Sequence, residues 1–390
     1  MAGLYIHIPF CKSRCIYCGF YSTTHSQLRQ QYVNALCKEM CLPASKWQAG
    51  PTDTSPKGVG QIETIYLGGG TPSQLTGEQL HQLFNYINKV YGLEHAKEVT
   101  MECNPDDITT TFVAALSQLP VNRISMGVQT FSDERLRFLH RRHTAEQIPL
   151  AVRLLRQTGI QNISIDLMYG FPCETLDDWH HDIDTALSLN VEHLSAYCLM
   201  FEEGTPLFKQ KAENERRKTK DPQYVPIDEE TELQMYTDLI DRLSAADYEH
   251  YEISNFAKPG YRSLHNSNYW NQTPYIGLGA AAHSYNGRDC RRWNIENLQQ
   301  YIAGIEAGEP VFEQEMLDDD TRYNDIVMTA LRTREGIDLS LLPTPQQTFC
   351  MKEAKRFLDD GLLRLTDSRL RLTRRGLFVS NMIMSELMKV

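Results

Sequence analysis

The chain has 390 residues, a net charge of −11 and a hydrophobic content of 41%. This length exceeds the size at which one hydrophobic core stops growing, so we expect one large domain and at least one smaller one. The composition indicates a cytoplasmic protein, because we find no run of about 18 apolar residues to span a bilayer, no secretory signal at the start, and an acidic balance that disfavours nucleic acid.

The first half of the chain alternates short apolar runs with longer amphipathic stretches, which is typical of a parallel sheet built from β/α units. Thr76 and Thr175 precede two of the predicted helices and can cap their first turns. Six units are too few for a closed eight-stranded barrel, so we expect an α/β fold with a partial, open (β/α)6 barrel of the TIM type. Strands are predicted over 4–9, 63–67, 98–102, 122–128, 161–167 and 193–199, and helices over 27–41, 76–91, 109–118, 132–140, 144–158 and 175–189.

Two segments without apolar periodicity interrupt this pattern. Residues 43–61 are rich in Pro, Gly, Ser and Lys, which predicts a loop inserted between the first helix and the second strand. Residues 213–228 are highly charged and predict a break, after which 229–245 resumes an amphipathic helix. We place the end of the barrel domain at this charged segment.

The last part of the chain predicts a smaller α+β domain. Helices are expected near 320–333 and 345–360, and 362–372 shows two alternating strands around a polar turn. Two helices followed by a hairpin suggest a winged-helix-like domain. The expected organisation is a barrel over 1–215, a barrel extension over 216–310 and the C-terminal domain over 311–390.

Three cysteines follow the first predicted strand with the spacing CxxxCxxC, namely Cys11, Cys15 and Cys18. Barrel proteins place their chemistry at this end of the strands. Three thiolates can bind three irons of a 4Fe-4S cluster, which normally takes four cysteines, so the fourth iron is left for another ligand. Zinc is the alternative, with His7 or His25 as a fourth ligand, but zinc motifs usually include a second ligand pair. We therefore favour the cluster, and expect the other seven cysteines to be inert core thiols.

Polar and glycine-rich segments end the later predicted strands. The run from Gly68 to Pro72 leaves backbone N–H groups accessible to a ligand, although it could equally be a tight turn. Glu102, Gln129 and Asp166 each stand at a strand end, and Arg141 follows twelve residues after Gln129. Each could simply be a satisfied polar residue at the rim, but their recurrence on successive strands indicates one ligand-binding mouth.

The cysteine spacing, the aromatic Tyr17 and the barrel pattern together resemble the radical S-adenosylmethionine superfamily. The resemblance implies that the open iron binds the amino and carboxylate groups of S-adenosylmethionine. It also implies that the reduced cluster can pass one electron to the sulfonium and release a 5′-deoxyadenosyl radical. The glycine run Gly68–Gly70 is then expected to face the methionine amino group.

Four segments narrow this resemblance and extend it over nearly the whole chain: 5–11, 68–72, 102–105 and 127–131. They are similar to the branch that contains oxygen-independent coproporphyrinogen III dehydrogenase and the heme chaperone HemW. The resemblance implies contacts with one or two S-adenosylmethionine molecules from Tyr5, Tyr17, Gly69, Gly70, Thr71, Glu102, Gln129, Arg141 and Asp166.

Two features separate these two relatives. The dehydrogenase type resembles CxxxCxxCxC, whereas Phe20 occupies the last position here, and the segment from His265 to Trp270 matches the HNxxYW pattern of the heme chaperone type. A histidine can ligate heme iron, and Tyr and Trp faces can pack on a porphyrin. Without the family context, a histidine hydrogen-bonded within an aromatic loop is the simpler interpretation. The resemblance implies heme binding by His265, Asn266, Tyr269 and Trp270.

The resulting hypothesis is a heme chaperone that binds heme and a 4Fe-4S cluster with S-adenosylmethionine and transfers heme to an acceptor protein. The alternative is an oxygen-independent coproporphyrinogen III oxidase, and a radical enzyme that modifies RNA or protein has the least support. The expected partners are a heme-accepting protein and a small electron donor. We assign no catalytic residue. The arginines near the C-terminus suggest a solvated or protein-docking face rather than a nucleic-acid site; they are Arg364, Arg369, Arg371, Arg374 and Arg375.

Overall fold

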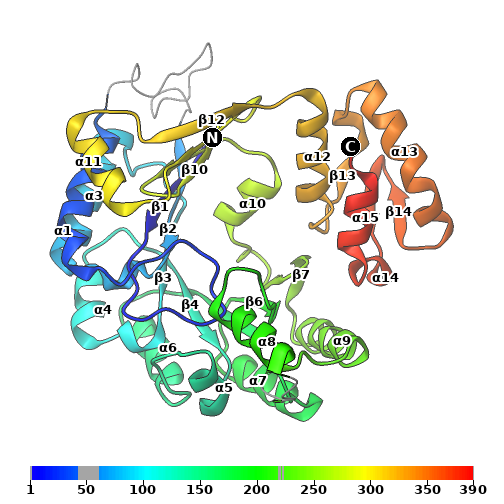
Figure 1. Cartoon of the computed structure of the whole chain (residues 1–390), viewed down its shortest axis with the longest axis horizontal. Coiled ribbons are helices and arrows are strands. Elements are labelled where there is room, and N and C mark those ends of the chain that lie inside the picture. Colours follow the sequence, from blue (N-terminus) through cyan, green and yellow to red (C-terminus); the bar gives the residue numbers. More distant parts are fainter. Residues whose placement is uncertain (1, 43–60, 218–220, 222–223, 390) are drawn as a thin grey trace.

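A computed structural model describes residues 2–42, 61–217, 221 and 224–389, and its main feature is a strongly curved sheet (Figure 1). The described residues form a twelve-stranded sheet with the order β12-β11-β10-β9-β1-β2-β3-β4-β5-β6-β8-β7. All six strands predicted from the sequence are present and run parallel, which confirms the partial barrel. They are β1 (Ala2–Ile8), β2 (Ile62–Gly69), β3 (Glu98–Cys103), β4 (Arg123–Gln129), β5 (Asn162–Tyr169) and β6 (His193–Cys198).

Helices cover the outer face of this sheet, and each begins close to its predicted position (Figure 1). Thr76 and Thr175 form capping boxes with Gln79 and Asp178, as their sequence positions predict. Side chains alternate along a strand, so Ile65 of β2 joins the core under the helices while its neighbours face the barrel interior. The helices are α1 (Arg29–Met40), α3 (Gly77–Tyr91), α4 (Thr110–Leu116), α5 (Asp133–Phe138), α6 (Gln147–Gln157) and α7 (Leu176–Ser188).

Both edges of the parallel sheet are extended by short strands that the sequence pattern did not reveal. On one side β9 (Tyr275–Leu278) pairs parallel with β1 and adds a seventh parallel strand. Strands of three to five residues are too short to show clear alternation, which is why they were missed. The remaining edge elements are β7 (Glu249–Glu252), β8 (Asn255–Ala257), β10 (His283–Tyr285), β11 (Cys290–Asn294), β12 (Phe312–Met316) and α11 (Leu298–Ala307).

The charged segment at 213–228 corrects one prediction. The helix α8 (Pro206–Arg217) continues through residues 213–217, which we expected to be a break. Glu, Lys and Arg are good helix formers, and Lys211 pairs with Glu215 one turn later at 3.9 Å, so the charges support the helix. The helix α9 (Glu229–Ala245) then follows as predicted. The predicted loop at 43–60 lies outside the described residues.

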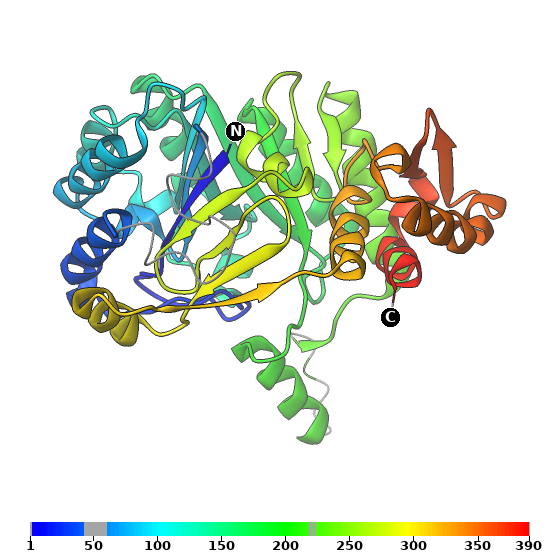
Figure 2. The same ribbon diagram turned by 90° about the horizontal axis from the view of Figure 1, so that it is seen from above.

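The C-terminal part forms its own layer of helices around a small sheet with the order β13-β15-β14 (Figures 1 and 2). A separate apolar core that includes Val327, Ala354 and Leu370 holds these elements together. This agrees with the predicted α+β domain, whereas the residue limits of the three expected domains stay predictions. The elements are α12 (Asp319–Ala330), β13 (Ile337–Asp338), α13 (Thr344–Asp359), β14 (Leu363–Thr366), β15 (Arg369–Leu372), α14 (Arg374–Leu377) and α15 (Ser380–Leu387).

Two further observations complete the fold. Short 3₁₀ turns occupy Ser26–Leu28, Pro72–Gln74, Pro105–Asp107 and Leu339–Leu341. In the part of the chain that the structure describes, no helix combines the length and apolarity needed to cross a bilayer.

Candidate functional site

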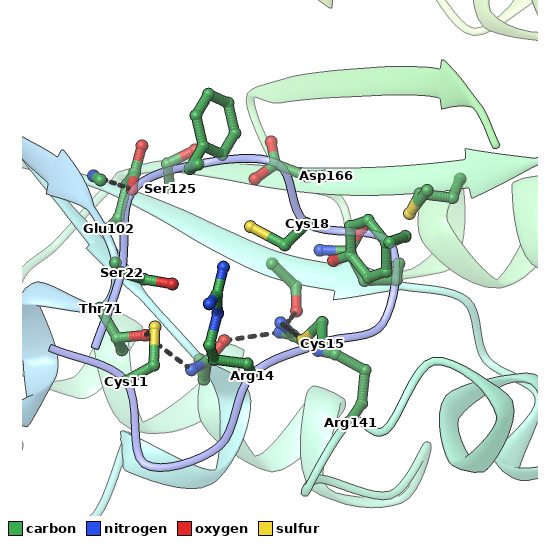
Figure 3. Close-up of a pocket in the computed structure, with 18 of the residues that line it drawn as sticks. Cys11, Arg14, Cys15, Cys18, Ser22, Thr71, Glu102, Ser125, Arg141 and Asp166 are labelled. Carbon is green, nitrogen blue, oxygen red and sulfur yellow. Dashed lines mark hydrogen bonds between the residues drawn. The ribbon is translucent and has the colours of Figure 1, made fainter. Parts of the chain in front are cut away.

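A cavity of about 460 Å³ opens at the carboxyl ends of the parallel strands (Figure 3). This is the end at which barrel folds place their ligands. The cavity brings together residues that are up to 255 positions apart in the sequence. Of the residues predicted from the sequence, it is lined by Cys11, Cys15, Tyr17, Cys18, Gly69, Gly70, Thr71, Glu102, Gln129, Arg141, Asp166 and Asn266.

The cysteine loop is held by hydrogen bonds that join its two ends and by a further one at its middle, which together position its thiols. At its start, the Cys11 N–H donates to the Thr23 carbonyl at 2.9 Å, and the Thr23 N–H donates to the Pro9 carbonyl at 2.7 Å. In its middle, Ile16 is buried against Leu139 and donates its N–H to that residue's carbonyl at 3.3 Å. The loop between these anchors leaves all three thiols partly exposed along one curve of the cavity wall (Figure 3).

Polar groups contact two of the three thiols. The Thr71 hydroxyl lies 3.5 Å from the Cys11 sulfur, and Arg141 Nη1 donates to the Cys15 sulfur at 3.6 Å. Burial raises the pKa of both Cys11 and Cys18. Thiolates bind iron, so metal binding at these positions must release their protons. Arg141 thus places a positive charge directly beside the Cys15 sulfur.

The zinc alternative loses one of its candidate ligands. His7 is buried, and its Nδ1 and Nε2 are hydrogen-bonded to the Tyr5 hydroxyl and the Tyr21 carbonyl, both at 3.0 Å. Among the described residues, no three His, Cys, Asp or Glu side chains converge closely enough to bind a single metal ion. The three thiols are all partly exposed on one loop, and three thiolates can ligate three irons of a 4Fe-4S cluster.

The glycine run is required by the backbone and also borders the cavity. Gly69 has a φ of +106°, and a Cβ there would lie 2.4 Å from His7 Cε1. At Gly70, whose N–H donates to the Ile8 carbonyl at 2.9 Å, a Cβ would lie 2.6 Å from the Pro9 carbonyl carbon. The turn therefore presses the end of β2 against β1, and the absence of side chains keeps the backbone open to the cavity.

Two carboxylates project from β3 and β5 beside the cavity (Figure 3). Glu102 accepts hydrogen bonds from the Tyr66 hydroxyl at 2.8 Å and from the Gly69 N–H at 3.1 Å. Burial raises the pKa of Glu102 to about 7, and burial likewise raises the pKa of Asp166 to about 6. Both carboxyl groups can therefore change protonation near neutral pH, which suits them to bind hydroxyl groups of a ligand as acceptors or donors.

Arg141 and Gln129 are positioned by an irregularity in β4. The register between β4 and β5 shifts between Gly127 and Gln129, and Gln129 adopts a left-handed φ of +69° that is uncommon for a residue with a side chain. Arg141 Nη2 donates to Asn104 Oδ1 at 2.6 Å and to the Gly127 carbonyl. Its buried Nε has no hydrogen-bond partner among the described residues. The guanidinium thus keeps one donor for a ligand.

The structure places four predicted residues outside the cavity lining: Tyr5, His265, Tyr269 and Trp270. Tyr5 lies beneath the cavity, where its ring stacks on Tyr66 with centroids 6.2 Å apart and its hydroxyl bonds to His7. Tyr5 therefore does not line the cavity itself, but it supports Tyr66, which does.

The HNxxYW segment forms the short helix α10 (Leu264–Trp270), which lies between the β1 and β6 sides of the curved sheet (Figure 1). The N–H groups of Leu264 and His265 both donate to the Glu98 carboxylate at 2.9 Å, so the helix begins at the amino end of β3. His265 is only 1% exposed. Its Nδ1 bonds to the Thr64 hydroxyl and its Nε2 to the Tyr269 hydroxyl, each at 2.9 Å.

These contacts match the simpler interpretation of the histidine as a satisfied, buried residue. Burial lowers the pKa of His265 to about 3, so the ring is neutral. At the other end of α10, Trp270 packs under the Arg332 guanidinium, which lies 5.3 Å from the ring centroid. The segment therefore links the barrel interior to the C-terminal domain, and Asn266 is its member at the cavity.

Several lining residues were not predicted from the sequence. Tyr66, Arg123, Ser125 and Ser195 face the cavity from inside the barrel, and Tyr197 and Met200 border it after β6. Arg123 carried a detectable signal, because it is the one charged residue in the predicted strand 122–128. The serines and Tyr66 carried none, because alternation along a strand buried on both faces is not visible in the sequence.

Comparisons with known proteins match both parts of the chain. Residues 5–186 match the model described as the Radical SAM superfamily, and residues 317–379 match the HemN C-terminal domain. Members of the Radical SAM superfamily are expected to use a 4Fe-4S cluster and S-adenosylmethionine. The cysteine loop and the polar cavity beside it fit both groups.

The similar proteins extend over almost the full length. The heme chaperone HemW of Bacillus subtilis is 34% identical over 98% of this chain and 97% of that protein. The heme chaperone HemW of Mycobacterium tuberculosis strain H37Rv is 34% identical over 99% and 94%, and that of Escherichia coli K12 is 34% identical over 80% of each.

A solved structure supports the fold. Coproporphyrinogen III oxidase HemN from Escherichia coli superposes with a TM-score of 0.81 and covers 100% of this chain and 90% of that one, at 23% sequence identity. At this identity the likeness concerns the fold alone. The sequence matches are more similar, at 34% identity over almost the full length, and they show that the chain belongs to the heme chaperone HemW family of the radical SAM superfamily.

Proposed function

We propose that this protein is a heme chaperone that binds heme, carries a 4Fe-4S cluster with S-adenosylmethionine, and transfers heme to an acceptor protein. The observation that carries the proposal is the 34% identity to a protein named heme chaperone over 98% of the chain. The cysteine loop beside a polar cavity supports the cluster and S-adenosylmethionine part of the proposal.

The cluster is proposed to be held by Cys11, Cys15 and Cys18. When bound, it supplies an iron that can take S-adenosylmethionine as ligand and an electron for its cleavage. A small electron donor is part of the proposal because such a cluster must be reduced. The protein's own contribution is to hold the loop at Phe10 and Ile16, both of which are buried.

S-adenosylmethionine is proposed to bind along the strand ends. The bare backbone at Gly69 and Gly70 admits the amino acid part, and the free Nε of Arg141 can donate to its carboxylate. Glu102 and Asp166 can accept from ribose hydroxyls. Tyr17, Thr71 and Gln129 complete the proposed lining, and Tyr5 supports it from below.

Two regions support heme binding, and the first is the mouth of the cavity. Phe20, Met200 and Tyr197 line it and are 71%, 69% and 43% exposed. Exposed large apolar side chains gathered in one place mark a binding surface for an apolar ligand or partner. A porphyrin presents such a flat apolar face.

The second region is α10, where His265 is the proposed axial ligand, flanked by Asn266, Tyr269 and Trp270. Because both ring nitrogens are hydrogen-bonded in this conformation, ligation of iron requires that one of these bonds be exchanged. The bond to Tyr269 lies within α10 itself, so a rotation of the Tyr269 side chain is enough to break it. The bond to Thr64 joins the helix to the barrel wall.

Oxygen-independent coproporphyrinogen III oxidation is the second candidate function and has less support. The exposed Phe20 replaces the last cysteine of the dehydrogenase pattern, and the likeness to coproporphyrinogen III oxidase concerns the fold alone. A nucleic-acid substrate gains no support from the C-terminal arginines. Arg369 pairs with Asp338 at 2.8 Å and Arg374 with Asp241 at 2.6 Å, which leaves them partly neutralised.

An anaerobic experiment on protein with a reconstituted cluster tests this proposal. The protein is incubated with S-adenosylmethionine, reductant and coproporphyrinogen III, and in parallel it is loaded with heme and mixed with a heme-free b-type cytochrome. We expect unchanged coproporphyrinogen and a shift of the Soret band to that of the cytochrome, faster than from heme-loaded albumin. Decarboxylated product, or transfer no faster than from albumin, contradicts the proposal.

A further inference from the structure

Arg123, near the amino end of β4, is a buried arginine whose hydrogen-bond donors are not all satisfied. The residue is only 1% exposed, yet it lines the same cavity as the cysteine loop. Its Nε and Nη1 have no hydrogen-bond partner among the described residues. A guanidinium is always charged, so two unpartnered N–H groups on a buried one are costly unless something else binds them.

Two half-buried arginines of the barrel, Arg142 and Arg135, are paired with carboxylates. Arg142 pairs with Asp106 at 2.8 Å and with Asp107 at 3.0 Å. Arg135 contacts Glu174 at 3.5 Å and Asp182 at 3.8 Å. Each of these cations has its own carboxylates, as expected for charges removed from water.

The polar groups around Arg123 are already occupied by other partners. Glu102 accepts from Tyr66 and from Gly69, as described above. The ring of His193 bonds to Ser164 and Tyr251, both at 2.7 Å. His265 is likewise bonded at both nitrogens. No bond from Arg123 Nε or Nη1 to any of these neighbours is present among the described residues.

The positive charge of Arg123 acts on titratable groups across the interior of the barrel. Burial is the main cause that lowers the pKa of His193 and His265, and the Arg123 cation adds to it in both cases. These histidines therefore stay neutral. The cavity floor thus holds a permanent positive charge with two unpartnered donors, and this charge lowers the pKa of Glu102 and Asp166 in opposition to the larger effect of burial.

We propose that Arg123 is a carboxylate-binding residue at the floor of the cavity, and that a carboxylate of the bound ligand occupies its free N–H groups. Arginine is suited to this role because its guanidinium presents fixed donors to planar anions. The identity of the ligand rests on the proposed function, which offers two sources: a propionate of heme and the amino acid carboxylate of a second S-adenosylmethionine molecule, because the carboxylate of the first is proposed to bind at Arg141. Arg141 can serve one ligand carboxylate near the loop, so Arg123 provides a separate place.

Matched ligands with and without the carboxylate test this assignment. Parent protein and Arg123→Gln, both with reconstituted clusters under anaerobic conditions, are titrated with heme and heme dimethyl ester, and with S-adenosylmethionine and its decarboxylated analogue. We expect Arg123→Gln to weaken one carboxylate-bearing ligand by about tenfold to a hundredfold. The carboxylate-free counterpart should bind parent and variant alike. The ligand that responds identifies the source.

Two controls keep the result interpretable. Arg292→Gln removes another arginine that is 1% exposed, from β11 and away from this cavity, so it shows what a destabilised barrel alone does to binding. Arg123→Lys retains the charge and replaces Arg123→Gln if that variant does not fold, as judged from thermal unfolding and cluster absorbance. An equal loss in Arg292→Gln, or equal binding of all four ligands by parent and Arg123 variants, overturns the proposal.

The two arms also separate this inference from the proposed function. If the parent binds no heme, the proposed function fails while the S-adenosylmethionine arm still tests Arg123. If the parent binds heme and S-adenosylmethionine but neither responds to the variant, the chaperone proposal stands and the assignment of Arg123 is wrong.

Discussion

The cavity at the carboxyl ends of the strands and the helix α10 both carry parts of the proposed function, and they differ in how their polar groups are used. In the cavity, three thiols are partly exposed and two arginines keep unpartnered N–H groups. In α10, His265 is buried with both ring nitrogens bonded. The first region is prepared for ligands, whereas the second is also part of the barrel's internal structure.

Both regions were identified by a short sequence motif, but one motif lies on an accessible ligand-binding loop and the other on a buried structural helix. A loop whose backbone is anchored while its side chains stay free can be changed with little effect on folding. The helix α10 cannot be changed in this way, because the side chain of His265 is hydrogen-bonded to Thr64 in the barrel wall. Variants in the cysteine loop should therefore lose ligand binding with little loss of stability, whereas variants in α10 should lose stability first.

The largest effect is expected in the cysteine loop. Replacing Cys11, Cys15 or Cys18 by Ser should abolish the charge-transfer absorbance and the iron content of a reconstituted sample, because each thiolate is proposed to ligate one iron. Unfolding of the apoprotein should change by less than about 1 kcal/mol, since the thiols are partly exposed. Cys41→Ser is the control and should retain the full absorbance; this thiol, like Cys173, is exposed and not in the core, where we had expected it. Absorbance that survives all three changes contradicts the cluster assignment.

His265 should show the opposite pattern. His265→Ala removes a buried ring and two hydrogen bonds, so we expect the free energy of unfolding to fall by about 2–4 kcal/mol. If the ring also ligates iron, heme affinity should fall at least about tenfold and the Soret band should shift. Urea titration and heme titration measure the two effects separately.

Tyr269→Phe is the matched control for this variant. It removes one hydrogen bond to His265 Nε2, at a cost of about 1 kcal/mol, and leaves that nitrogen free. Heme binding through Nε2 should then be retained or strengthened. A spectrum that is the same in parent, His265→Ala and Tyr269→Phe shows that the histidine serves the structure alone.

Much of this arrangement could be predicted from the sequence because its signals are local. The six strands have apolar runs of their own, and Thr76 and Thr175 mark helix starts that the structure reproduces. The contacts of α10 could not be predicted. His265 meets Thr64, 201 positions earlier in the chain, and only the packing of α10 against the curved sheet brings them together. Arg123 gave a local signal without a local explanation, since its neighbours include Glu102 of β3, Asp166 of β5 and His265 of α10.

The next effect concerns pH and tests the electrostatics of the cavity. The pKa of Glu102 is raised by burial from 4.5 to about 7, so the folded state holds this proton more tightly than the unfolded state. Between about pH 4.5 and 7 stability should therefore fall as pH rises, by on the order of 2 kcal/mol from this group. Glu102→Gln should flatten that part of the profile.

Urea unfolding of the apoprotein at several pH values measures this slope. Glu78→Gln, on the exposed side of α3, removes a carboxylate elsewhere and should leave the slope unchanged. An unchanged slope in Glu102→Gln would show that the cavity is better hydrated than its burial indicates.

The smallest effect on stability, and the sharpest test of the comparison, is expected at Phe20. Its side chain is 71% exposed, so Phe20→Ala should change the free energy of unfolding by less than about 0.5 kcal/mol. If the porphyrin packs on the apolar mouth formed by Phe20, Tyr197 and Met200, heme affinity should still fall severalfold, because an aromatic face contributes about 0.5–1.5 kcal/mol to such a contact. Leu341→Ala, at another exposed apolar side chain outside the cavity, is the control. If Phe20→Ala loses heme affinity and His265→Ala does not, heme binds at the mouth of the cavity. If His265→Ala loses heme affinity and Phe20→Ala does not, heme binds at α10, and that helix must open to admit it.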